Sequence, residues 1–132
     1  MKKRVMALLT ILACLSGSIV GLSNTGVKQN NYVAEAATLG EINALATAKL
    51  HLNTMAFSKK SLKDQLVFEG FSKKEANYAV KKCGANWKKQ AAKKAQDYID
   101  MMPLSKQQLV DQLKFEGFTD KQIKYGVKQV GY

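Results

Sequence analysis

The sequence predicts an all-α protein in which two tandem three-helix, helix-turn-helix-like repeats follow an N-terminal signal segment. The stretch FSKKSLKDQLVFEGFSKKEANYAVKKCG at residues 57–84 returns 47 positions later, without a gap, as LSKQQLVDQLKFEGFTDKQIKYGVKQVG at residues 104–131. Each copy of such a repeat must be one supersecondary unit. The chain has one proline, Pro103, and after residue 40 no stretch alternates polar and apolar residues for long enough to form a strand, so helices are expected there.

The first 36 residues are predicted to be a secretory signal peptide with a polar c-region. They start with MKKR, a positively charged n-region, and continue with an apolar run that glycine and serine interrupt. This run is too short for a good membrane span, which needs about 20 apolar residues. The tripeptide AEA then ends at Ala36, so signal peptidase is expected to cleave between Ala36 and Ala37.

A lipoprotein signal is the alternative for this segment. The tetrapeptide ILAC ends at Cys14 and resembles a lipobox. In that case residues 1–13 are the signal, Cys14 carries a lipid anchor, and residues 14–40 form a tether. Both alternatives export the chain, either to the cell surface or into the medium, whereas an uncleaved membrane anchor is a third alternative.

The first repeat is predicted at residues 41–85, with helices at about residues 41–55, 59–69 and 73–83. Apolar residues at spacings of three and four predict the inward face of the first helix: Ile42, Leu45, Ala48, Leu52 and Met55. The third helix carries a similar stripe of small residues that ends at Cys83, which is expected to be a small buried apolar residue. A reactive thiol is the alternative for Cys83.

The second repeat is predicted at residues 86–132, with helices at about residues 87–102, 106–116 and 120–130. Asn86 can cap the helix that begins at Trp87, and the join between the two repeats is short. Because a unit of about 45 residues buries only a marginal core, the two copies are expected to pack on each other. Trp87 is placed where it can pack between them.

Local signals predict where the shorter helices begin and end. Ser72 with Glu75, and Thr119 with Gln122, have the spacing of a capping box, in which each side chain satisfies a free backbone N–H. Two further N-caps are expected at Ser58 and Ser105, and the left-handed positions that end helices are expected at Gly70 and Gly117.

The block DQL-x-FEGF is identical in both copies and supplies the expected core and the expected partner surface. Its apolar members and their neighbours are predicted to build the repeat core: Leu62, Leu66, Phe68, Phe71, Val80, Leu109, Leu113, Phe115, Phe118 and Val127. Its polar members have no evident packing role, so they are candidates for helix surface, internal polar bonds or a partner-binding surface: Asp64, Gln65, Glu69, Asp111, Gln112 and Glu116.

The charge of the exported part suggests anionic partners. After Ala36 the chain holds 17 lysines, no arginine and 9 acidic residues. Such a surface is attracted to teichoic acid, anionic lipid or DNA, and it offers a route to the membrane or the cell wall through charge. Sequence-specific binding of nucleic acid is not expected, because the protein is exported and its exported part lacks arginine, the residue that most often reads guanine.

No arrangement of residues predicts catalysis. His51 is the single histidine, and no spaced carboxylate pair, Ser/His/Asp set, Cys/His pair or phosphate-binding loop accompanies it. A non-enzymatic protein without catalytic residues, metal or cofactor is therefore expected, and duplication favours a binding protein. We expect a monomer.

The residues resemble the Ltp-type host cell surface-exposed lipoproteins of Gram-positive bacteria and their prophages. The resemblance covers residues 41–132 and rests on the segments NALATAKLHL, FSKKSLKDQLVFEGFS, ANYAVKKCGANW and YGVKQVGY. It implies two compact three-helix units held outside the membrane. Prophage-borne members act in superinfection exclusion: they leave adsorption intact and block the passage of phage DNA, and the implied target is the phage tape measure protein.

Overall fold

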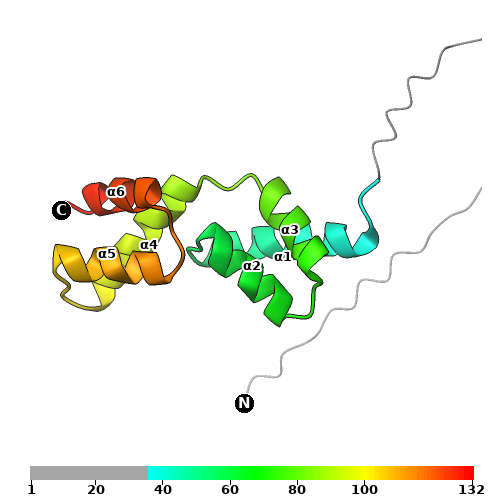
Figure 1. Ribbon diagram of the computed structural model, residues 1–132, viewed down its shortest axis with the longest axis horizontal. Coiled ribbons are helices and arrows are strands. Elements are labelled where there is room, and N and C mark those ends of the chain that lie inside the picture. Colours follow the sequence, from blue (N-terminus) through cyan, green and yellow to red (C-terminus); the bar gives the residue numbers. More distant parts are fainter. Residues whose placement is uncertain (1–35) are drawn as a thin grey trace, which may run out of the picture. The chain divides into compact units, whose positions relative to one another are not determined.

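The computed structural model describes residues 36–132, and this part of the chain is helical without strands (Figure 1). Cys14 and the lipobox lie outside the described residues. The helices, in chain order, are α1 (Leu39–Thr54), α2 (Lys59–Phe68), α3 (Lys73–Lys82), α4 (Trp87–Met101), α5 (Lys106–Phe115) and α6 (Asp120–Gln129). The all-α class and the two three-helix repeats are therefore confirmed.

Each repeat has its own hydrophobic core. In the first repeat α3 packs against α1 and α2, and in the second α6 packs against α4 and α5. Leu62 and Leu66 of α2 are fully buried, as are their counterparts Leu109 and Leu113 of α5. Residues four apart lie on one face of a helix, so each leucine pair points inward together.

Small residues allow the first and third helices of each repeat to pack closely, α1 with α3 and α4 with α6. Ala44 and Ala48 of α1 are fully buried, and Ala91 and Ala95 occupy the same positions in α4. A Cβ added at Gly126 of α6 would lie 2.9 Å from the backbone carbonyl carbon and oxygen of Ala91. Backbone atoms cannot move aside as a flexible side chain can, so α4 and α6 need a glycine at this contact.

The predicted caps are present. Ser58, Ser72, Ser105 and Thr119 each accept a hydrogen bond from the backbone N–H three residues later, and each belongs to a capping box. Asn86 caps α4 by accepting from the N–H of Lys89. After α2 and α5 the chain turns through Gly70 and Gly117, whose φ angles are 102° and 90°. An L side chain would be strained there, which explains the repeated glycine.

Two predicted core residues are on the surface instead. Phe68 is 87% exposed and Phe115 is 84% exposed. Each follows an inward leucine by two residues, which rotates it by about 200° around the helix, away from the core. Phe118 fills the expected place in the second core, and its counterpart Phe71 is half-buried against the first. Val80 and Val127 are buried as predicted.

The first helix differs from the expectation in its start and its inward face. It begins at Leu39, two residues before the predicted start, because Thr38 and Glu41 form a capping box. Ile42 and Met55 are exposed, which contradicts their predicted burial. The narrow buried face consists of Glu41, Ala44 and Ala48, with Leu45 and Leu52 half-buried beside it.

The two repeats contact each other, as expected from their short join. The Ser58 hydroxyl is fully buried and donates a hydrogen bond to the backbone carbonyl of Glu116 in the other repeat. The backbone N–H of Phe57 donates to the side-chain oxygen of Gln90 at 3.2 Å. Trp87 of α4 packs against the core of the first repeat, which confirms the predicted role between the copies.

Candidate functional site

A polar bridge holds α1 and α2 together in the first repeat. Glu69 accepts one hydrogen bond from the Gln65 side chain at 2.8 Å and pairs with His51 Nε2 of α1 at 2.7 Å. Gln65 and Glu69 were candidates for partner binding, and the structure shows that both bond internally. The lone histidine therefore has a structural partner that its position in the sequence did not reveal.

The second repeat rebuilds this bridge with a different residue. Tyr98 occupies the position of His51, 47 residues later, and its hydroxyl donates to Glu116 and accepts from Gln112 at 3.0 Å. Burial raises the pKa of the Tyr98 hydroxyl, and the hydrogen bond to Glu116 raises it further. Lys94 Nζ lies 5.9 Å from the centre of the Tyr98 ring. Gln112 and Glu116 thus bond internally as well.

The remaining two polar candidates lie on the surface beside the exposed phenylalanines. Asp64 pairs with Lys60 at 2.6 Å, and Asp111 accepts from Gln107 at 2.9 Å, each bond spanning one exposed helical turn. Four residues separate Asp64 from Phe68, as they do Asp111 from Phe115, so each aspartate and phenylalanine share a helix face. Sequence reasoning missed this surface; the signal was that both phenylalanines stand out of phase with the inward leucines.

Phe115 borders a hollow between α4 and α5. The hollow has a volume of about 480 Å³, and Met102, Leu104 and Gln108 also line it. Met102 and Phe115 are both exposed, and Met55 and Phe68 are the exposed residues at the same positions of the first repeat. Each repeat therefore presents a methionine and a phenylalanine to solvent from the same two positions of its fold.

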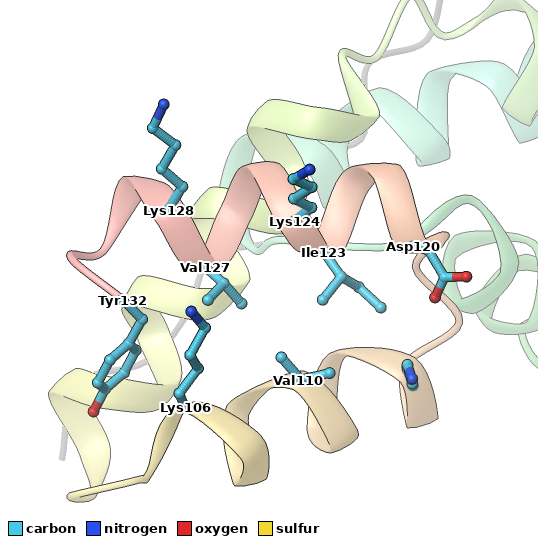
Figure 2. A pocket seen from close by; sticks show the side chains of 9 residues that line it. Lys106, Val110, Asp120, Ile123, Lys124, Val127, Lys128 and Tyr132 are labelled. Carbon is cyan, nitrogen blue, oxygen red and sulfur yellow. The ribbon is translucent and has the colours of Figure 1, made fainter.

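A second hollow lies between α5 and α6, and it combines an apolar floor with basic residues (Figure 2). Its volume is about 570 Å³. Ile123 and Val127 extend from α6 toward Val110 of α5, while Lys124 and Lys128 extend outward from α6 (Figure 2). We call this surface the α5–α6 groove.

The described residues contain no group of three or more histidine, cysteine, aspartate or glutamate side chains that could hold a metal ion. Cys83 is half-buried against the first core, and its thiol contacts the carbonyl oxygen of Val80 at 3.6 Å. Its counterpart Val130 packs against the second core, which fits the interpretation of Cys83 as a small apolar residue. Between residues 36 and 132, none of the helices has the length and apolar character to cross a membrane.

Comparison with known proteins identifies the family. A search of curated proteins finds no match. Among solved structures, the chain is similar to Ltp, a superinfection exclusion protein from the Streptococcus thermophilus temperate phage TP-J34, at 34% identity and a TM-score of 0.67. The similarity covers 70% of this chain and 96% of that protein. Residues 41–82 and 86–130 match the Ltp lipoprotein family, whose description agrees with the predicted location at the cell surface. The chain therefore belongs to the family of host cell surface-exposed lipoproteins.

Proposed function

We propose that this protein acts in superinfection exclusion: outside the membrane, it contacts a phage tail protein and blocks the injection of phage DNA. The observation that carries the proposal is the similarity to the phage exclusion protein Ltp, which extends over 96% of that chain and includes both repeats. The tape measure protein is the expected target, since it lies in the tail that must open for DNA to pass.

The partner surface is proposed to centre on Phe68 and Phe115. Large exposed aromatic side chains are enriched where proteins bind partners, and they supply much of the binding energy there. Neither phenylalanine is needed for the core, yet both copies place one at the same point beside an aspartate. The internal bridges of Gln65 with Glu69 and of Gln112 with Glu116 hold this end of α2 and α5 against the first helix of each repeat.

Attachment to the cell would strengthen exclusion by raising the local concentration of the protein at the membrane. A protein held at the membrane surface has a high local concentration where the phage tail opens its channel. A lipid on Cys14 would provide this attachment, whereas cleavage between Ala36 and Ala37 would release the protein. The mass of the mature N-terminus separates these two cases, because a diacylated Cys14 and a free Ala37 differ by the lipid and by the intervening residues.

The test is expression in a phage-sensitive host, with adsorption and DNA injection measured separately. Normal adsorption with strongly reduced injection is expected. The double variant Phe68→Ser/Phe115→Ser should restore injection, while Leu50→Ser, a change at an exposed apolar residue of α1, should not. Full DNA injection in cells that display the unchanged protein in good amount would refute the proposal.

Attachment to the envelope through charge is the second candidate function. It is favoured by the excess of lysine over acidic residues, and by the fact that the ion pairs within residues 36–132 engage one lysine, Lys60. Binding to purified cell walls or anionic vesicles should then collapse as salt is raised, because exposed charges are screened. Non-specific DNA binding predicts the same salt dependence in a gel shift, and no shift at low salt would remove it.

A further inference from the structure

The α5–α6 groove has the chemistry of a docking site. Its floor is the half-buried Val110 together with Ile123 and Val127, which are one helical turn apart on α6. Tyr132 closes one end, and its hydroxyl donates to the backbone carbonyl of Leu104. Because Ile123 and Val127 are each only 3% exposed, the apolar surface open to solvent in the groove comes from the half-buried Val110 and the exposed Tyr132. This is the surface that a partner could remove from water.

Lysines surround the floor on both helices. Lys106 and Lys114 belong to α5, and Lys124 and Lys128 belong to α6. None of the four takes part in an ion pair with another described residue. One acidic residue, Asp120, lines the groove. The rim is therefore strongly positive and lacks internal partners that would neutralise it.

The first repeat does not carry the same groove chemistry, although the folds correspond residue by residue. Lys63 stands where Val110 forms the floor, and Ala76 stands where Ile123 does. On the rim, Val67 and Asn77 replace Lys114 and Lys124. Lys59 and Lys81 keep the lysines found at Lys106 and Lys128, so both copies are basic at these positions. The apolar floor at Val110 is thus the property of the second copy, which makes the first copy an internal control for charge.

We propose that the α5–α6 groove binds an amphipathic, acidic α-helix of the partner protein. Apolar side chains at i and i+4 of such a helix would lie against Val110 and Tyr132, above the buried Ile123 and Val127, as in other complexes in which a helix occupies a groove. Its acidic side chains would meet the lysines of both rims. That the partner is a phage protein rests on the proposed function, whereas the chemistry of the helix follows from the groove.

The test is a titration of the exported chain with a synthetic peptide of about 15 residues, long enough to cover the 15 Å of a ten-residue helix. The peptide carries leucine at i, i+3, i+4 and i+7 and glutamate elsewhere. A scrambled peptide of the same composition keeps the charge and loses the apolar stripe. Fluorescence anisotropy should show saturable binding of the first peptide and at least tenfold weaker binding of the second. Equal binding of both peptides would overturn the proposal.

Two exchanges between the repeats separate groove binding from simple charge attraction. Val110→Lys introduces the residue of the first copy, and it should weaken binding about tenfold because an apolar contact is lost. If the peptide bound through charge alone, its affinity for this variant would instead rise, since the variant gains a positive charge. Lys63→Val removes a charge from the first copy and should leave the affinity for the peptide at least as high. Unchanged or tighter binding by Val110→Lys would contradict the groove.

Rim variants cover the case in which Val110→Lys does not fold. Lys114→Val and Lys124→Asn also import residues of the first copy, and both positions are exposed, so circular dichroism should show an unchanged fold. Each should weaken peptide binding and reduce its salt dependence. Binding of anionic vesicles without any binding of the peptide would assign the groove to lipid and overturn the proposal. The titration uses no phage, so its result does not depend on exclusion. If the peptide binds but the protein does not exclude phage, the proposed function is refuted and the groove proposal is not.

Discussion

The buried hydroxyl of Ser58 joins the two repeats, and its removal should reveal how strongly they depend on each other. In the variant Ser58→Ala two interactions disappear. One is the N-cap of α2, in which the hydroxyl oxygen accepts from the N–H of Ser61 at 2.9 Å. The other is the hydrogen bond that the hydroxyl donates to the carbonyl of Glu116 across the interface.

The magnitude follows from these two losses. Loss of an N-cap costs about 1 kcal/mol. The Glu116 carbonyl also loses the donor of a part-buried hydrogen bond, which costs about 1–3 kcal/mol more where water does not replace the donor. Since Ser58 is fully buried, we expect Ser58→Ala to lower the free energy of unfolding by about 2–4 kcal/mol.

Ser105 is the matched control. It caps α5 in the same way, accepting from the N–H of Gln108 at 3.2 Å, but it is exposed. Ser105→Ala should therefore cost only the cap, about 1 kcal/mol. Urea and thermal unfolding of the exported chain measure both, and for about 100 residues each kcal/mol shifts the Tm by roughly 4–8 °C. Equal destabilisation by the two variants would refute the cross-repeat contribution.

Three further predictions concern the same two repeats. Gly126→Ala should lower the free energy of unfolding by about 1–2 kcal/mol, since the new Cβ meets the Ala91 backbone at 2.9 Å; an unchanged Tm would contradict this packing. Because the pKa of Tyr98 is raised in the fold, its stabilising effect should be complete below about pH 10 and be lost as the pH rises through the raised value. Unfolding at increasing pH should show this loss in the unchanged chain and not in Tyr98→Phe. Phe68→Ser and Phe115→Ser should change the free energy of unfolding by less than about 0.5 kcal/mol, because both side chains are exposed. A large decrease measured by urea unfolding would show that these side chains belong to the core.

Helix boundaries were predicted well because their signals are local. A cap such as Ser72 with Glu75 acts within four residues, and the turn at Gly70 depends on the backbone of one residue. Helix α1 begins two residues before its predicted start, at a capping box of Thr38 and Glu41 that is a local signal of the same kind.

The sequence alone could not predict whether the polar candidate residues bond internally or face a partner. Whether Glu69 faces a partner or bonds internally depends on His51, which α1 brings to it from 18 residues away. The same position in the second copy depends on Tyr98, a residue of different chemistry, so the repeat alone does not reveal the shared bridge. The burial of Ser58 depends on the Glu116 carbonyl, 58 residues later.

The sequence by itself determined the duplication, the three helices of each copy, the basic surface and the expected export. These follow from spacing, capping residues and composition, which act over a few residues or are summed over the chain. Only the tertiary structure decided that Phe68 and Phe115 face solvent, that the repeats meet through Ser58, and that one copy carries an apolar groove between lysines. The physical reason is that burial of a side chain depends on which distant helices pack around it.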